Sequence, residues 1–210
     1  MGFELYGFWR STASWRVRIA LNLKELPYSQ SPRHLRLGEQ AAPDFLALNP
    51  QGFVPALRLP DGQVLTQSLA ICEYLDEVVP APPLLPAEPL ARARVRAFSQ
   101  IIACDVHPIQ NLKILKRLKE LGHDQPTIDR WAANIIEEGL DACEALATDG
   151  GLYTMGAKVT LADVLLVPQL GNARRFGAKL RWPRLLAAEA ACERLAAFQQ
   201  ARPERQPDAE

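Results

Sequence analysis

Three hydroxyl side chains lie close together near the start of the chain, at Ser11, Thr12 and Ser14. They follow a run typical of a strand, residues 3–8, and they open a run typical of a helix. The first turn of a helix has free backbone N–H groups and the positive end of the helix dipole, so it favours an anion. Position 13 is alanine, so the chain supplies no thiol within this cluster. We therefore expect the anion to come from outside, as the thiolate of a bound cofactor.

The overall charge and hydropathy argue against several classes of partner. The 210 residues contain 24 Lys and Arg and 24 Asp and Glu, so no global field favours nucleic acid or an anionic membrane. Apolar runs are interrupted well short of the roughly 20 residues that span a bilayer. The first residues lack the basic and apolar regions of a secretory signal, and we expect a cytoplasmic protein.

The four cysteines are widely separated and lie in apolar helical patterns: Cys72, Cys104, Cys143 and Cys192. The sequence has no CxxC pair and no Cys/His cluster, which argues against a zinc site or a dithiol redox centre. We expect four reduced thiols in the protein core, and no metal.

Residues 1–83 combine strand and helix patterns. The predicted strands are residues 3–8, 28–35, 54–59 and 64–66. The last two form a hairpin, because the Asp61-Gly62 turn supplies the positive φ that such a loop needs. Residues 14–26 predict a helix, and Ser68 is expected to cap another that runs to Val79. This order of elements indicates a small mixed sheet covered by helices.

The chain changes character after a proline-rich connector at residues 80–86. Strand signals almost vanish, and four long helices are predicted. These cover residues 90–121, 127–147, 160–176 and 184–201. Thr160 and Asp163 have the spacing of a capping box at the start of the third helix. The sequence beyond Pro203 is polar, and we expect it to be loosely held.

This layout resembles that of the soluble glutathione transferases. Residues 10–21, Arg-Ser-Thr-Ala-Ser-Trp-Arg-Val-Arg-Ile-Ala-Leu, are similar to the zeta-class signature, usually Ser-Ser-Cys-Ser-Trp-Arg-Val-Arg-Ile-Ala-Leu. The zeta class is also the maleylacetoacetate isomerase family and includes bacterial maleylpyruvate isomerases. Matching motifs follow in order along the whole chain. They include Ala47-Leu-Asn-Pro50, Val54-Pro55, Gln67-Ser68, His107-Pro108, Thr160-Leu-Ala-Asp163, Asn172-Ala-Arg-Arg-Phe176 and Gln206-Pro-Asp208.

The resemblance implies the glutathione transferase fold, with a thioredoxin-like α/β domain at residues 1–83 and an all-α domain at residues 88–210. The chain departs from the family at Ala13, where the signature commonly has cysteine. That cysteine is not the thiol that acts on the substrate in the family mechanism. The departure therefore bears on the identity of the substrate more than on the chemistry.

The resemblance also implies a glutathione site. Ser11 would activate the glutathione thiol, with Thr12 in support, because a hydroxyl that donates to sulfur lowers the pKa of the thiol. The residues alone leave open that Ser11 only caps the helix. Val54 would precede a cis-proline and pair its backbone with the cysteinyl part of glutathione. The other implied glutathione contacts are Gln40, Gln51, Gln67, Ser68, His107 and Asn111.

Arginines supply the implied substrate contacts. Arg10 and Arg175 would clamp the carboxylates of a small cis-enol diketo acid, since guanidinium groups bind carboxylates at two points. Arg174 competes with Arg175 for this role, and the match to the family's Arg-Phe pair favours Arg175. Lys113 lies where related enzymes place a polar or basic residue, and a solvated lysine is the alternative.

By this resemblance, the activity is the isomerisation of maleylacetoacetate to fumarylacetoacetate in tyrosine and phenylalanine catabolism. Glutathione thiolate adds to the cis double bond, the bond rotates, and elimination restores a trans alkene with glutathione unchanged. Alternatives are a maleylpyruvate isomerase of aromatic degradation, and a general glutathione transferase or α-haloacid dehalogenase. A non-catalytic binding protein of the same fold is a further alternative, against which the retained Ser11 argues. The family implies a homodimer.

Overall fold

The computed structural model describes residues 2–210. Contacts between Cα atoms divide the chain into two units: unit 1, Met1–Leu84 with Arg194–Glu210, and unit 2, Leu85–Glu193. The sequence places all of residues 88–210 in the helical domain, whereas the structure groups the last 17 of them with unit 1. Among the described residues, no helix has the length and apolar character needed to cross a membrane.

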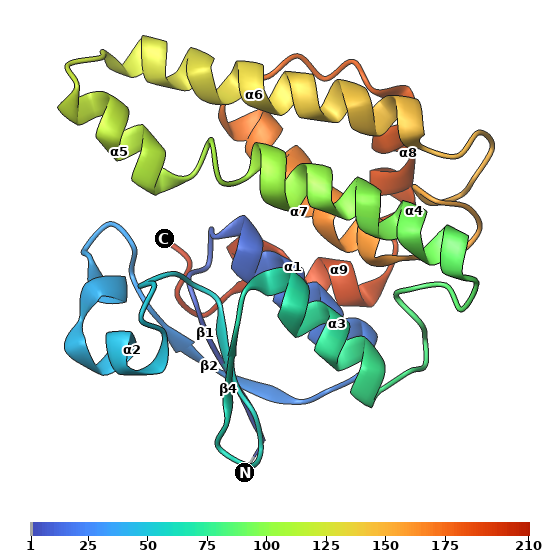
Figure 1. The fold of residues 1–210 in the computed structure, drawn as a ribbon, viewed down its shortest axis with the longest axis horizontal. Helices are drawn as coiled ribbons and strands as arrows, with labels where there is room; N and C mark the ends of the chain where they lie inside the picture. The colour runs from blue at the N-terminus through green and yellow to red at the C-terminus, as the bar shows by residue number, and fades with distance from the viewer. Residues whose placement is uncertain (1) are drawn as a thin grey trace. The chain divides into compact units, whose positions relative to one another are not determined.

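Unit 1 contains the predicted small mixed sheet (Figure 1). Its strands are β1 (Phe3–Gly7), β2 (Tyr28–Pro32), β3 (Ala56–Arg58) and β4 (Val64–Thr66). The strand order is β2-β1-β3-β4, with β1 parallel to β2 and antiparallel to β3, and with β3 antiparallel to β4. The second strand ends at Pro32 and not at residue 35, because its partner β1 ends at Gly7, whose carbonyl accepts the last bond of the ladder, from the Arg33 N–H at 2.7 Å.

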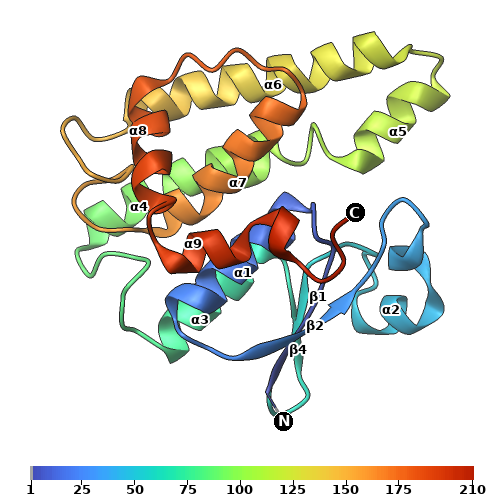
Figure 2. The ribbon, with the colours of Figure 1, turned by 180° about the vertical axis from the view of Figure 1, so that it is seen from behind.

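The described part of unit 1 contains four α-helices: α1 (Thr12–Leu23), α2 (Pro43–Leu48), α3 (Ser68–Val78) and α9 (Ala196–Ala201). Helix α1 packs against both α3 and α9 (Figure 2). Its apolar side chains are fully buried at Val17, Ile19 and Leu21. Short 3₁₀ turns at Glu39–Ala41 and Pro203–Arg205 complete the unit. Contact between α9 and α1 explains why the end of the chain belongs to unit 1.

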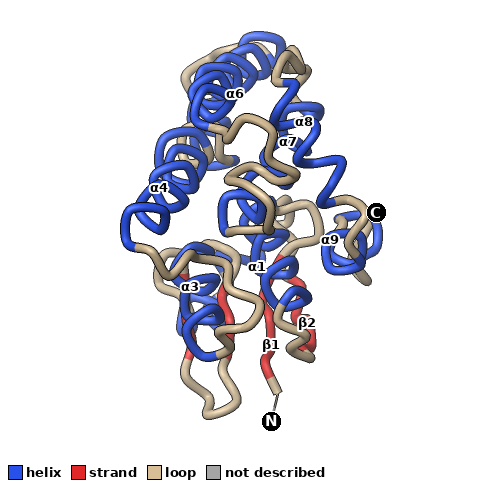
Figure 3. Tube along the Cα trace, turned by 90° about the vertical axis from the view of Figure 1, so that its right-hand side faces the viewer, coloured by secondary structure: helices blue, strands red, loops and turns tan. Residues whose placement is uncertain are grey.

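Unit 2 is helical, and its described residues include no named strand (Figure 3). Its helices are α4 (Pro89–Gln100), the π-helix η2 (Ile101–Val106), α5 (Leu112–Glu120), α6 (Gln125–Leu146), α7 (Leu161–Arg175) and α8 (Pro183–Cys192). The prediction of one helix over residues 184–201 was wrong, since Leu195 is extended and separates α8 from α9.

The prediction of one helix over residues 90–121 was also wrong. Helix α4 continues into a π-helix, the chain turns at residues 107–111, and α5 begins at Leu112. Pro108 lacks the N–H that would continue a helix, and the Asn111 side chain caps the new one by accepting from the Lys113 N–H at 3.2 Å. The interruption therefore has a local cause, which the apolar periodicity hides.

The predicted capping box at the start of α7 is confirmed. Asp163 is fully buried and accepts four hydrogen bonds, from the N–H and hydroxyl of Thr160 and from the N–H and hydroxyl of Thr154. Burial raises the pKa of Asp163 above its ordinary value, and the hydrogen bonds oppose that shift. This network fixes the N-terminal end of α7, the helix that ends at Arg175.

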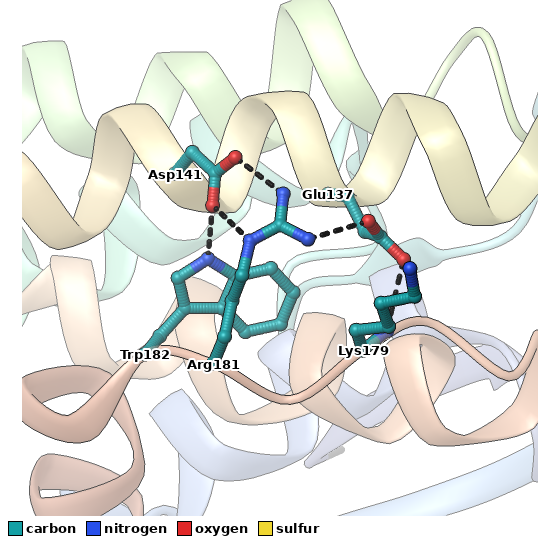
Figure 4. Close-up of polar contacts among 5 residues, drawn as sticks. All are labelled: Glu137, Asp141, Lys179, Arg181 and Trp182. Carbon is teal, nitrogen blue, oxygen red and sulfur yellow. Dashed lines mark hydrogen bonds and ion pairs between the residues drawn. The ribbon is translucent and has the colours of Figure 1, made fainter.

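A second polar cluster holds the segment that follows α7 (Figure 4). The Arg181 guanidinium bonds Glu137 at 2.7 Å and Asp141 at 2.6 Å, both on α6. Asp141 also accepts from the indole N–H of Trp182 at 2.7 Å, and Glu137 accepts from the backbone N–H of Lys179 at 2.9 Å. Both ends of α7 are thus tied to the rest of unit 2.

Candidate active site

The first turn of α1 carries the predicted hydroxyl cluster. The helix begins at Thr12, two residues before its predicted start, and Ser11 is its N-cap. Ser11 Oγ accepts a hydrogen bond from the Ser14 N–H at 3.2 Å. Because the oxygen serves as the acceptor, the hydroxyl hydrogen of the half-buried Ser11 stays available to donate. The capping role and a donor role toward an anion are therefore compatible at this residue.

The other two hydroxyls of the cluster are buried. Ser14 is fully buried, and its Oγ accepts from the Phe8 N–H at 3.4 Å. A Cβ on Gly7 would lie 3.2 Å from that Oγ, so glycine permits the close approach of β1 to the helix. Thr12 is only 4% exposed. These residues set the position of the Ser11 hydroxyl, which is the most accessible of the three.

The start of α3 provides a second polar edge. Gln67 is its N-cap with φ of 69°, a left-handed backbone conformation that is costly for a residue other than glycine. Its side chain donates to Gln51 Oε1 at 2.8 Å. The expectation that Ser68 caps this helix was wrong, because Ser68 is its first helical residue. Ser68 Oγ instead accepts from the buried Arg16 guanidinium at 3.3 Å.

The Val54-Pro55 peptide bond is cis, as the resemblance to the family implied. Val54 lies just before β3 and packs against the buried Tyr6 and Phe45. Neither the N–H nor the C=O of Val54 has a hydrogen-bond partner among residues 2–210. An extended peptide could pair with this free stretch of backbone, as one strand pairs with another.

Two further glutamines lie next to this edge. Gln51 is bonded to Gln67, and its own N–H donates to Asn49 Oδ1 at 3.1 Å. The Gln40 carbonyl oxygen lies 3.0 Å from where a Cβ on Gly52 would be. Gln40 Oε1 is buried, and no residue of the described chain donates to it. The structure thus gathers Gln40, Gln51 and Gln67 on one side of unit 1.

Arg10 directly precedes the hydroxyl cluster and is half-buried. Its guanidinium lies 5.3 Å from the centroid of the Trp9 ring. Within residues 2–210, no carboxylate forms an ion pair with it. Burial lowers the pKa of Arg10, the charge of Arg36 lowers it further, and Glu210 opposes both. Arginine nevertheless stays charged at neutral pH, so Arg10 offers a cation to an external anion.

In unit 2, the predicted residues lie around the interrupted helix. His107 and Asn111 do not share one helix face as their spacing suggests, because they occupy a turn and an N-cap. They still contact each other, with Asn111 Nδ2 3.4 Å from His107 Nε2. Lys113, in the first turn of α5, is exposed.

The end of α7 distinguishes the two neighbouring arginines. Arg174 forms two hydrogen bonds with Glu189, at 2.7 and 2.5 Å. Arg175 is exposed, and its guanidinium stacks over Phe176 at 5.0 Å from the ring centroid. Arg174 is therefore committed to a structural ion pair.

Sequence reasoning missed one residue that supports this region. Gln110 is buried in the turn after the π-helix, and its Oε1 accepts from Asn172 Nδ2 on α7 at 3.3 Å. The bond joins the turn that carries His107 and Asn111 to the helix that carries Arg175. A glutamine beside Pro108 offered no helical pattern that would have predicted it to be buried.

Together, unit 1 offers a hydroxyl donor at a helix N-terminus, a cation at Arg10 and a free backbone edge at Val54. These features suit an anionic, peptide-like ligand whose reactive group is acidic and lies near Ser11. Residues 2–210 contain no group of three His, Cys, Asp or Glu placed to hold a metal ion.

Comparison with known proteins identifies the family. Residues 10–78 match the N-terminal domain model of glutathione S-transferases, and residues 117–198 match the C-terminal domain model. The maleylacetoacetate isomerase of Pseudomonas aeruginosa is 46% identical over 208 residues, which cover 98% of each chain.

Two solved structures are similar along their whole length. One is a maleylpyruvate isomerase, described as a bacterial glutathione S-transferase of the zeta class, with a TM-score of 0.95 and 48% identity. The alignment covers 99% of this chain and 100% of that one. The other is a maleylacetoacetate isomerase from Methylobacterium extorquens with bound malonate and GSH, with a TM-score of 0.94, 40% identity and 99% coverage of both chains. These similarities confirm the predicted fold, and the chain belongs to the zeta class of the glutathione S-transferase family.

Proposed function

We propose that this protein is a glutathione-dependent cis–trans isomerase that converts maleylacetoacetate to fumarylacetoacetate. The observation that carries the proposal is that the Ser11 hydroxyl donor and the unpartnered backbone of Val54 lie at the same end of the sheet. Ser11 follows β1 and Val54 precedes β3, and these two strands are antiparallel. Relatives support it, since a similar isomerase has been solved with GSH and the dicarboxylate malonate bound. The reaction places the enzyme in tyrosine and phenylalanine catabolism.

The residues present fit glutathione, which when bound supplies a sulfur nucleophile for the conjugated double bond. Ser11 donates its hydroxyl hydrogen to the sulfur, and Thr12 supports the helix start that holds it. Val54 pairs its backbone with the tripeptide. We assign further contacts with glutathione to the remaining polar side chains of the site: Gln40, Gln51, Gln67, Ser68, His107 and Asn111.

Arg10, Arg175 and Lys113 are proposed to bind the substrate. A guanidinium group that holds a carboxylate at two points orients the substrate. A cation near the adjacent carbonyl also stabilises negative charge as it develops there. In this assignment, residues 1–83 form the glutathione-binding domain and residues 88–210 contribute the substrate domain. The tail beyond residue 193 is the exception, because it belongs to unit 1.

Maleylpyruvate is the second candidate substrate, because a maleylpyruvate isomerase is 48% identical to this chain. Incubating each cis acid with the enzyme, with and without glutathione, tests both candidates. We expect trans product only with glutathione, and recovery of all the glutathione unchanged. Equal rates without glutathione would contradict the mechanism, and a stable glutathione adduct would instead indicate a transferase or dehalogenase. The faster cis acid identifies the substrate.

The proposal includes a homodimer in the cytoplasm, as in the family that the sequence resembles. Sedimentation of the purified protein across a range of concentrations tests the association. We expect a single species of twice the 23.3 kDa chain mass. A species of one chain mass at all concentrations would contradict a dimer and leave the isomerase proposal intact.

A further inference from the structure

The tail of the chain is bonded to unit 1, although its polar sequence predicted a loosely held segment. Gln206 is 6% exposed. Its side-chain amide donates to the carbonyls of Gln200 and Arg202 at 2.9 and 2.6 Å, and its Oε1 accepts from Gln30 at 3.0 Å. The Ala209 N–H returns to the Gln206 carbonyl at 3.1 Å. These bonds fix a turn that contains Asp208.

Asp208 contacts the segment that leads into the hydroxyl cluster. Its Oδ2 accepts from the backbone N–H of Trp9 at 2.9 Å. Trp9 lies between the end of β1 and Ser11, where its N–H has no partner from the sheet or from α1. A carboxylate that accepts from a backbone N–H forms one of the stronger hydrogen bonds in proteins.

The carbonyl group of Trp9 is also held. The buried Arg18 guanidinium donates to the Trp9 carbonyl at 2.8 Å and to the Ala201 carbonyl, at the end of α9, at 3.0 Å. Both backbone groups of Trp9 are thus bonded by side chains, and one of those side chains also holds the C-terminal helix. Asp208 and Glu204 both lie near the Arg18 charge.

Two proposed site residues depend on the placement of Trp9. Arg10 stacks on the Trp9 ring, and the Ser11 N–H donates to the Phe8 carbonyl at 3.0 Å across the Trp9-Arg10 turn. Movement of the Trp9 backbone would therefore displace both the Arg10 guanidinium and the Ser11 hydroxyl.

We propose that Asp208 is a positioning residue of the active site, which fixes the Ser11 hydroxyl and the Arg10 guanidinium through the Trp9 backbone. The inference rests on the proposed function of Ser11 and Arg10. It assigns to the C-terminal tail a role in catalysis, beyond the stability of unit 1.

The test compares Asp208→Ala, Asp208→Asn and the control Glu204→Gln. Glu204 is exposed, lies in the same tail and near the same arginine, and has no bond to Trp9. In Asp208→Ala we expect the Trp9 amide to exchange its hydrogen about tenfold faster than in the wild type. We also expect the midpoint of the kcat–pH profile to rise, because a displaced Ser11 stabilises the thiolate less.

Asp208→Asn retains an oxygen acceptor without the charge, so its effects should lie between those of Asp208→Ala and the wild type. Glu204→Gln should change neither exchange nor the pH profile. If Asp208→Ala does not fold, Asp208→Asn and Glu204→Gln are compared instead, by Trp9 amide exchange and by the kcat–pH profile. Equal behaviour of Asp208→Asn and Glu204→Gln in both measurements would overturn the proposal, as would faster exchange with an unchanged pH profile.

The two proposals fail in different ways. A wild-type enzyme that isomerises neither cis acid would contradict the proposed function. In that case, the pH dependence of the ultraviolet absorbance of bound glutathione thiolate replaces kcat, and Trp9 exchange is measured as before. The Asp208 proposal would again be overturned if its variants left the thiolate titration at its wild-type midpoint, with or without faster exchange of the Trp9 amide.

Discussion

The two units hold their site residues by different means. In unit 1 these residues lie at the ends of regular elements, with Ser11 capping α1, Gln67 preceding α3 and Val54 preceding β3. In unit 2, His107 and Asn111 lie around a π-helix and a turn that separate α4 from α5, and Arg175 lies at the end of α7. The first arrangement begins with local signals at the ends of these elements, and the bond from Asp208 to the Trp9 N–H then holds the segment before Ser11. The second depends on bonds between segments that are distant in sequence, such as Gln110 with Asn172.

The largest contrast concerns thiol reactivity. Cys72, in α3, is fully buried, and burial raises the pKa of its thiol to about 12 from an ordinary 9.0, whereas Cys104 in the π-helix is exposed. We expect Cys104 of the native protein to react with a disulfide reagent at least about a thousandfold faster than Cys72, since the thiolate is the nucleophile. This exposure corrects the expectation of four core thiols.

The measurement is the time course of labelling, with peptide mapping to locate the label. Cys104→Ser should remove the fast phase and leave the slow ones. Fast labelling of Cys72 in the folded protein would show that unit 1 opens readily. It would contradict the expected difference in reactivity between Cys72 in α3 and Cys104 in the π-helix.

A large effect on activity is expected for Ser11→Ala. Removing a hydrogen-bond donor from a developing or bound anion typically lowers kcat about a hundredfold. Loss of the cap should also reduce the free energy of unfolding by about 1 kcal/mol. Steady-state kinetics and urea unfolding measure the two effects. Ser11→Thr, which retains a hydroxyl, serves as the control, and an unchanged kcat with a destabilised helix would show that Ser11 is only a cap.

An intermediate effect is expected for Asn172→Leu in unit 2. It leaves the buried Gln110 amide without its remaining bond, which costs about 1–3 kcal/mol of unfolding free energy. Because the turn with His107 and Asn111 loses its tie to α7, we expect kcat/KM to fall about tenfold. The double variant Gln110→Leu/Asn172→Leu should be less destabilised than the sum of the single variants. Additive losses of unfolding free energy, together with a wild-type kcat/KM, would argue that the bond between Gln110 and Asn172 does not position the site residues.

The smallest effect is expected for Arg181→Ala, because the ion pairs of Arg181 are exposed. Hydrogen bonds from Arg181 and then Trp182 lower the pKa of Asp141 below its ordinary 3.8. A carboxyl whose folded-state pKa is depressed stabilises the fold above its ordinary pKa and loses that effect as the pH falls through the folded value. The difference in unfolding free energy between wild type and Arg181→Ala should therefore be constant from about pH 7 to 5 and shrink below about pH 4. A difference that grows on acidification would contradict this sign.

The same contrast explains what the sequence could predict. The Ser11 cap and the Thr160/Asp163 box follow from signals within a few residues. The cis Val54-Pro55 bond follows only from the resemblance to the family, and all three are present in the structure. The break at residues 101–111 was missed because apolar periodicity continues through it. The tail was missed because two of its side chains bond to residues that are distant in sequence, Asp208 to Trp9 and Gln206 to Gln30.

The central claim is that Ser11 stabilises a bound glutathione thiolate, and its most direct test is an ultraviolet titration of glutathione on the enzyme. A free thiol ionises near pH 8.5, and the account predicts a midpoint about two pH units lower on the wild-type enzyme. In Ser11→Ala the midpoint should return most of the way to that of free glutathione. A wild-type midpoint equal to that of free glutathione would contradict the account.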